Sequence, residues 1–143
     1  MKTAGPTRVL VIDDDEIARE LLVSVLEKAG FQVFSLPSPI GATRVIQFHD
    51  VSAIVLDVVM PALSGDRLTT LLRHNPRFAK LAVVLVSGDG GIELSKLAAK
   101  VGADGVVSKK DIRQSLAKRV NEAVRLRAQP AEAVPEALPK KAK

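Results

Sequence analysis

The chain has 143 residues and a formal net charge of +5; hydrophobic residues make up 47% of it and aromatic ones only 3%. This length and apolar content suit one domain with an aliphatic core. The absence of cysteine excludes disulfides and thiolate metal sites, and no aromatic residues interleave the basic ones as in single-strand nucleic-acid binders. No apolar run approaches the roughly 18 residues that cross a membrane, and the first residues lack the apolar core of a secretory signal. We therefore expect a cytoplasmic protein with no membrane contact and no direct DNA binding.

Short apolar runs alternate with segments of helical periodicity along most of the chain. The predicted strands lie at 9–12, 31–35, 53–56, 81–86 and 106–107. The first helix has apolar residues at helical spacing and ends at Gly30, and its apolar positions are Ile17, Leu21, Leu22, Val25 and Leu26. Further helices are expected at 40–48, around Leu68, Leu71 and Leu72, at 92–101 and at 111–127. Residues 1–127 thus form the predicted domain, and residues 128–143, rich in Pro, Ala and Lys, are expected to be a disordered tail.

Strict alternation of strands and helices indicates an α/β fold with a parallel sheet. Right-handed crossovers between parallel strands place helices on both faces, which gives three layers. A flavodoxin-like (βα)5 arrangement with strand order 2-1-3-4-5 would bring the first and third strands side by side. The residues that follow these two strands would then lie next to each other.

Polar residues follow four of the predicted strands. They are Asp13 and Asp14 after the first, Asp57 after the third, Ser87 after the fourth and Lys109 after the fifth. Three adjacent carboxylates repel one another unless a cation lies among them, and Mg²⁺ suits such an all-oxygen site. A carboxylate can also act as a nucleophile and form an aspartyl-phosphate. Lys109 and the Ser87 hydroxyl would then be placed to stabilise phosphoryl oxygens.

These residues resemble the receiver domain of response regulators, the CheY-like family. The matching pieces are Val-Leu-Val-Ile-Asp13-Asp14-Asp15, Ile-Val-Leu-Asp57-Val-Val-Met-Pro61, Val-Val-Leu-Val-Ser87-Gly, and Gly102-Ala103-Asp104 leading to Lys109. Each piece alone is a weak signal. Four pieces in order, each at a predicted strand end, make a strong one over roughly residues 8–127.

The resemblance implies a role for each site residue. Asp57 would accept a phosphoryl group from the phosphohistidine of a sensor histidine kinase or a phosphotransfer protein. Asp13, Asp14, Asp57 and the backbone carbonyl of Val59 would hold Mg²⁺. The Ser87 hydroxyl would move toward the phosphate and Lys109 would pair with it. We therefore expect a stand-alone response regulator of a two-component phosphorelay, which signals by phosphorylation-dependent binding of a downstream protein.

The same resemblance implies a phosphoacceptor rather than a turnover enzyme. Self-phosphotransfer and slow autodephosphorylation are the expected activities. The sequence does not identify the kinase or the downstream protein.

Two departures from the family pattern support an alternative function. Val106 stands where the family usually has Tyr or Phe, and Lys110 stands where Pro usually follows the lysine. Because a cis bond without Pro costs about 3 kcal/mol, we expect a trans bond or a strained loop after Lys109. The alternative is a degenerate receiver that acts as a phosphorylation-independent interaction module.

A third hypothesis is a small phosphatase of the haloacid-dehalogenase type. The strand followed by Asp13-Asp14-Asp15 loosely resembles the Asp-x-Asp signature of those enzymes, and Asp13 would then be the nucleophile. Such enzymes also carry a later acidic pair, and after Lys109 the chain has no adjacent acidic pair and only one aspartate, Asp111. The receiver interpretation accounts for more of the residues.

Overall fold

The computed structural model describes residues 5–60, 63–88 and 92–128. The predicted disordered tail starts at residue 128, but Ala128 is the last residue of α5. Residues 129–143 lie outside the described residues, so for them that expectation stays a prediction. Strands β1 (Arg8–Ile12), β2 (Gln32–Leu36), β3 (Ala53–Asp57), β4 (Ala82–Ser87) and β5 (Gly105–Ser108) form one sheet. The helices are α1 (Glu16–Lys28), α2 (Ala42–Phe48), α3 (Gly65–Arg73), α4 (Ile92–Val101) and α5 (Ile112–Ala128). Short 3₁₀ turns, η1 and η2, occupy Pro76–Phe78 and Lys109–Asp111.

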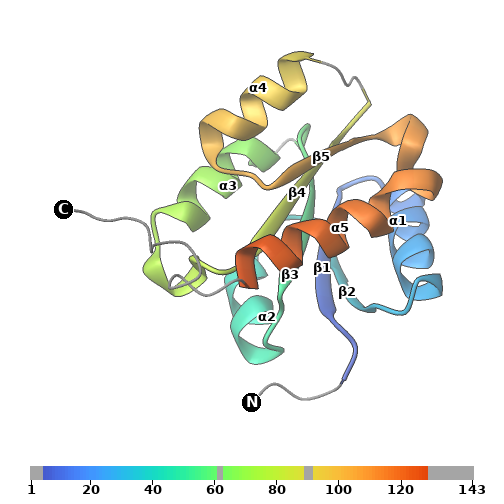
Figure 1. The fold of residues 1–143 in the computed structure, drawn as a ribbon, viewed down its shortest axis with the longest axis horizontal. Coiled ribbons are helices and arrows are strands. Elements are labelled where there is room, and N and C mark those ends of the chain that lie inside the picture. The colour runs from blue at the N-terminus through green and yellow to red at the C-terminus, as the bar shows by residue number, and fades with distance from the viewer. Residues whose placement is uncertain (1–4, 61–62, 89–91, 129–143) are drawn as a thin grey trace.

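All pairings in the sheet are parallel, and the strand order is β2-β1-β3-β4-β5. This is the flavodoxin-like α/β fold that the alternation of apolar runs and helical segments predicts. Helices α1 and α5 cover one face of the sheet, and α2, α3 and α4 cover the other (Figure 1). The three predicted layers are therefore confirmed.

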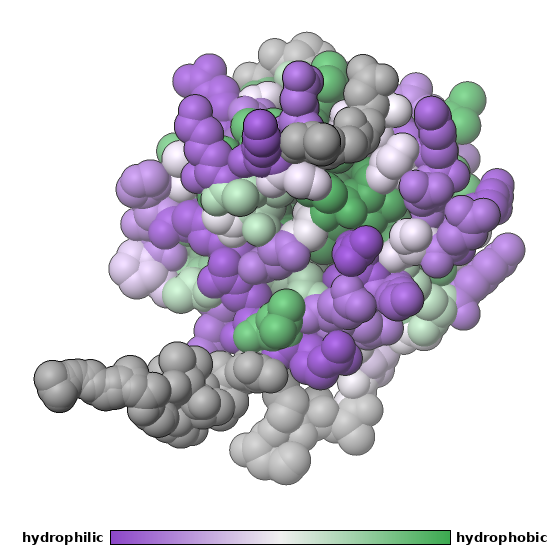
Figure 2. Space-filling model, turned by 45° about the horizontal axis from the view of Figure 1, so that its top comes forward, coloured by the Kyte–Doolittle hydropathy of each residue, from purple (hydrophilic) through white to green (hydrophobic). Residues whose placement is uncertain are grey.

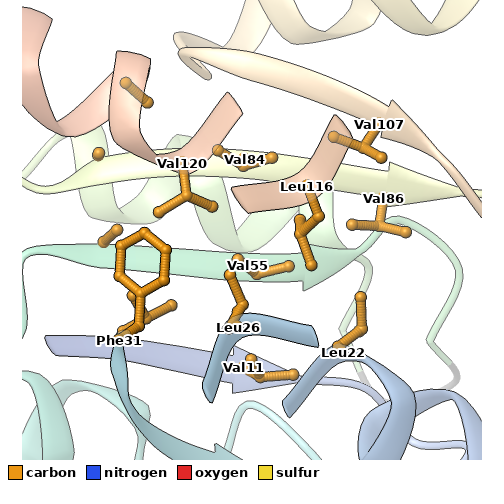
Figure 3. Close-up of a cluster of buried hydrophobic side chains, with 14 of the residues drawn as sticks. Val11, Leu22, Leu26, Phe31, Val55, Val84, Val86, Val107, Leu116 and Val120 are labelled. Atoms are coloured by element: carbon orange, nitrogen blue, oxygen red, sulfur yellow. The ribbon is translucent and has the colours of Figure 1, made fainter. Parts of the chain in front are cut away.

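The inner strands are unbroken apolar runs because both of their faces are buried. Alternate side chains enter opposite layers: Val55 packs under α1 and α5, whereas Leu56 packs under α2 and α3. Figure 3 shows the first layer, in which Leu22 and Leu26 of α1 and Leu116 and Val120 of α5 face valines of the sheet. The aliphatic core expected from composition is present on both faces.

Two apolar residues that mark predicted helices lie outside this core. The side chain of Ile17 is 79% exposed and that of Leu71 is 60% exposed. Ile17 is in the first turn of α1, which begins beyond the end of β1, so it extends past the sheet edge. Leu71 lies about 100° around α3 from its buried neighbour Leu72, which turns it away from the sheet.

An ion-paired cluster joins three segments at the amino-terminal edge of the sheet. The carboxylate of Asp104 accepts hydrogen bonds from Arg73 of α3 at 2.8 Å and from Arg127 of α5 at 2.7 Å. It also accepts from the backbone N–H of Val83 at 2.9 Å. Burial lowers the pKa of Arg73, and the charge of Asp104 opposes that shift. The end of α5 is therefore fastened to the start of β4.

We expect Leu116→Ala to lower the free energy of unfolding by about 2–5 kcal/mol, because Leu116 is fully buried and the change leaves a cavity. The matched control is Leu126→Ala on the same helix, where the side chain is 61% exposed and the change is within about 0.5 kcal/mol. Urea unfolding followed by circular dichroism measures both, since the chain has no Trp. Equal losses in the two variants would contradict the described core.

Candidate functional site

The sheet order brings the predicted acidic residues together. Ile12 is paired with Leu56 across β1 and β3, so Asp13 follows one strand next to Asp57 at the end of the other. One carboxylate oxygen from each of Asp13, Asp14 and Asp57 lies within 4.8 Å of the other two. Asp13 is fully buried and Asp57 is 4% exposed, whereas Asp14 is exposed. The cluster is thus buried on one side and open to solvent on the other.

Asp57 is held by backbone and side-chain donors from different segments. Its Oδ1 accepts a hydrogen bond from the backbone N–H of Val59 at 3.1 Å, and its Oδ2 lies 3.4 Å from Lys109 Nζ. The N–H of Val58 donates to the carbonyl of Val86 at 2.9 Å, which ties the start of this loop to β4. The carboxylate is therefore oriented before any ligand arrives.

Gly65 lets the loop after β3 fold tightly against Asp57. Its N–H donates to the Val58 carbonyl at 3.1 Å, and a Cβ at this position would lie 2.5 Å from the carbonyl oxygen of Asp57. Real Cβ atoms do not approach a backbone oxygen this closely, so the first residue of α3 has to be glycine. The position of α3 is in this way coupled to the position of Asp57.

Asp13 has one satisfied and one unsatisfied carboxylate oxygen. Its Oδ1 accepts from the backbone N–H of Asp15 at 2.9 Å. Its Oδ2 has no hydrogen-bond partner among the described residues, and the ammonium of Lys109 is 3.9 Å away. Burial raises the pKa of Asp13, the hydrogen bond from Asp15 lowers it, and the charge of Asp57 raises it again. The cluster therefore has more negative charge than Lys109 alone balances.

A hard divalent cation fits this arrangement. A buried, unpartnered carboxylate oxygen beside two further carboxylates offers the all-oxygen ligands that Mg²⁺ prefers, and the exposed side leaves room for its waters. Asp15 does not compete for this role, because its side chain accepts from the Ala18 N–H at 2.7 Å and caps α1. Of the consecutive acids that follow β1, Asp15 therefore caps the helix, and Asp13 and Asp14 belong to the cluster.

Lys109 reaches the cluster from the start of the turn η2. The hydroxyl of Ser108 accepts from the Lys110 N–H at 3.3 Å and caps this turn. All peptide bonds in the described part of the chain are trans, so the bond after Lys109 is trans as expected. Lys109 faces both Asp57 and Asp13, whereas Lys110 is exposed.

The remaining predicted residues lie at the same edge of the sheet. Ser87 is the last residue of β4, 9% exposed, and follows Val86, the partner of Asp57 in the sheet. Val59 contributes its N–H to Asp57, and its side chain is 73% exposed. Val106, in the position where the family usually has an aromatic residue, is half-buried and packs against the core layer under α2, α3 and α4.

Sequence reasoning missed Arg19. Its guanidinium donates to the backbone carbonyl of Asp13 at 2.8 Å and so anchors α1 to the residue that follows β1. Arg19 lies four residues after the cap residue Asp15, on the first full turn of α1. This position near the acidic residues could have identified it from the sequence. Arg19 holds the backbone of Asp13, while Lys109 faces its side chain.

A parallel sheet with a buried acidic cluster and a lysine at its carboxyl edge is the arrangement of a receiver. The family model for the response regulator receiver domain matches residues 9–121, and the chain belongs to this family. Its members are components of two-component signalling and are phosphoacceptor domains rather than turnover enzymes.

Several known proteins are similar to this chain. Protein RcaC of Microchaete diplosiphon is 33% identical over 115 residues, which are 80% of this chain and 18% of that protein. The transcriptional regulatory protein FixJ of Azorhizobium caulinodans is 38% identical over 101 residues, 71% of this chain and 47% of FixJ. The chain thus spans less than half the length of each. The crystal structure of a putative response regulator from Chloroflexus aurantiacus has a TM-score of 0.78 and 28% identity, and the match covers 84% of this chain and 98% of that one.

No helix in the described ranges is long and apolar enough to cross a membrane.

We expect Asp13→Asn to raise the free energy of unfolding by about 1–3 kcal/mol in the presence of a chelator, because it removes a buried charge with an unpartnered oxygen. Since the pKa of Asp13 is raised, its ionised form destabilises the fold at neutral pH. That penalty disappears as the pH falls through the raised pKa, so the gain should shrink in acid. Urea unfolding at several pH values measures this.

The control for that experiment is Asp15→Asn. It makes the same chemical change two residues away on an exposed side chain and keeps a good helix cap, so stability should change by less than about 0.5 kcal/mol. A loss of stability in Asp13→Asn without metal would contradict this prediction, because it would mean that the ionised carboxylate of Asp13 stabilises the fold on its own.

We expect Gly65→Ala to cost about 1–3 kcal/mol, because the new Cβ would overlap the carbonyl oxygen of Asp57. Gly88→Ala is the matched control, since a Cβ there meets nothing within 4 Å. Thermal unfolding of both variants compares the two positions. An unchanged melting temperature in Gly65→Ala would mean that the loop after β3 relaxes at no cost.

Proposed function

We propose that this chain is a response regulator that accepts a phosphoryl group on Asp57 from a sensor histidine kinase or a phosphotransfer protein. The observation that carries the proposal is the cluster itself: three carboxylates within 4.8 Å and Lys109 Nζ 3.4 Å from Asp57 Oδ2. A carboxylate that only capped a turn would need neither the two other acids nor the lysine. Carboxylates gathered at a strand edge, one of which has a raised pKa, as Asp13 does, more often mark a reactive site than a turn.

In the proposed reaction an oxygen of Asp57 forms a bond to phosphorus while the P–N bond to the donor's imidazole breaks. The electron pair of that bond remains on the imidazole nitrogen, and Asp57 becomes an acyl phosphate. Asp57 is suited to this role because the Val59 N–H fixes its orientation and the ammonium of Lys109 lies 3.4 Å from its Oδ2. Lys109 and the Ser87 hydroxyl would stabilise charge on the oxygens of the transferred group.

The proposed metal ligands are the carboxylates of Asp13, Asp14 and Asp57 and the backbone carbonyl of Val59. A bound Mg²⁺ supplies positive charge for the phosphoryl oxygens and screens the three carboxylates from one another. Asp13 is pre-positioned for this by the N–H of Asp15 and by Arg19 on its carbonyl. Asp14 is the ligand on the exposed side of the cluster.

Phosphorylation would then change which proteins the chain binds. Lys109 and Ser87 lie at the ends of β5 and β4, so a shift of either toward a phosphate would be transmitted to the loops before α5 and α4. We place the reaction in the cytoplasm, with a protein rather than DNA as the downstream partner. Self-phosphotransfer from small phosphodonors and slow autodephosphorylation belong to the same proposal.

The alternative is a receiver that has lost phosphorylation and acts only by binding a partner. The observation that favours it is Val106, because a half-buried valine lacks the ring that the family usually moves between two positions. The intact acidic cluster argues against it, since a purely structural module gains nothing from a buried carboxylate oxygen without a partner. Calorimetric titration with Mg²⁺ separates the two, because the alternative predicts no metal binding.

We expect the full chain, treated with acetyl phosphate and Mg²⁺, to gain one phosphoryl group by intact mass, and Asp57→Asn to gain none. Lys109→Ala should slow the gain by about 100-fold, by loss of a charge that stabilises the transferred group. Lys110→Ala is the matched control and should react at the parental rate, because that side chain is exposed and makes no ion pair with the cluster. A phosphoryl group that persists in Asp57→Asn would exclude Asp57 as the acceptor.

A further inference from the structure

A cavity with a volume of about 650 Å³ lies at the edge of the sheet opposite the acidic cluster. Its walls come from the end of α2, from η1 and the residues after it, and from the last turns of α5. Its apolar lining is provided mainly by Ile46, Val51, Phe78, Leu81 and Val124. Two cations, Arg77 and Lys80, stand exposed at its rim together with the acid Asp50. None of the residues assigned to the proposed phosphoryl transfer lies at this end of the molecule.

The chain itself leads into this cavity. Ala128, the last described residue, is one of the lining residues. The residue before it is fixed, because Arg127 donates to the carbonyl of Ala79 at 3.0 Å and to Asp104 at 2.7 Å. Whatever follows Ala128 therefore starts beside the segment that carries Arg77 and Lys80.

The sequence that follows is complementary to the cavity. Residues 132–139 read Glu-Ala-Val-Pro-Glu-Ala-Leu-Pro, a four-residue pattern that occurs twice. Each copy has one carboxylate, an alanine, one larger aliphatic side chain and a proline, and proline favours extended backbone in the residue before it. Only three residues separate Ala128 from Glu132, so at no more than about 3.3–3.6 Å per residue the first copy stays near the rim.

We propose that the segment 132–139 of this chain docks in the cavity between α2, η1 and α5. Val134 and Leu138 enter the apolar lining, and Glu132 and Glu136 pair with Arg77 and Lys80. The segment competes well for this site because its attachment at Ala128 makes docking intramolecular, with a high effective concentration. A separate ligand or a second copy would have to displace a covalently attached competitor.

The absence of cysteine in the chain allows a direct test. A single cysteine introduced as Ala137→Cys in the full chain carries a nitroxide spin label, and the amide signals of the ¹⁵N-labelled protein are recorded with the label oxidised and reduced. We expect the amides of Ile46, Val51 and Leu81 to lose most of their intensity. Those of Leu56 and Val86, toward the carboxyl edge of the sheet, should keep theirs.

Two matched sets of variants identify the contacts. In the spin-labelled chain, Val134→Ser with Leu138→Ser should abolish the selective loss of intensity, while Val134→Ile should retain it. Arg77→Glu with Lys80→Glu should weaken the effect, and combining these with Glu132→Lys and Glu136→Lys should restore it. Arg77 and Lys80 are exposed, and the other positions lie beyond the described residues, so none of the changes alters a described core residue. The amide spectrum of each variant checks that the sheet is intact.

Three outcomes would overturn the proposal. The first is an even, weak loss of intensity over the whole surface. The second is a loss concentrated at the acidic cluster. The third is a loss that appears only between molecules, in a mixture of ¹⁵N-labelled unmodified chain and unlabelled spin-labelled chain, which would make a second copy the occupant. None of these results depends on phosphorylation, so they leave the proposed function separately testable.

Discussion

Mutual repulsion of carboxylates at the carboxyl edge of the sheet is the constraint on which the site depends. Asp13 and Asp57 are both buried, and the only cation that the described residues bring within 4 Å of their carboxylate oxygens is Lys109, at 3.9 Å and 3.4 Å. Such an arrangement destabilises the fold unless a cation joins it. The two aliphatic layers on either side of the sheet supply the stability that holds it in place. The site is therefore organised to bind a ligand at a cost to the stability of the ligand-free protein. Figure 2 shows that hydrophilic and hydrophobic side chains adjoin on one face of the molecule.

Hydrogen bonds with backbone groups fix the positions of Asp13 and Asp57. The N–H groups of Asp15 and Val59 orient the side chains of Asp13 and Asp57, and Arg19 binds the carbonyl of Asp13. Gly65 allows α3 to begin directly against Asp57. Because these donors belong to the main chain or act on it, the geometry of the carboxylates follows from the path of the loops rather than from flexible side chains.

The fold and most of the site could be predicted from the sequence because both rest on local patterns. Buried strands appear as apolar runs, and the residues that follow them, such as Asp57 and Lys109, must meet at one edge once the strands are parallel. Side-chain contacts between segments that are far apart in the sequence could not be predicted. The bonds of Asp104 with Arg73 and Arg127 join segments 31 and 23 residues apart, and no periodicity marks them. Ile17 shows a related limit, because helical spacing cannot reveal that a first turn extends beyond the sheet.

The cluster formed by Arg127 and Asp104 has a practical consequence. It fixes the last turn of α5 at the amino-terminal edge of the sheet. The first described residues, from residue 5, also enter the sheet at this edge, where β1 begins at Arg8 (Figure 1). Both ends of the folded region therefore leave from the side opposite Asp57. An affinity tag, a fluorescent reporter or an attachment to a sensor chip joined next to residue 5 or next to Ala128 would start on the side away from the acidic face, which stays free to meet a phosphodonor in solution.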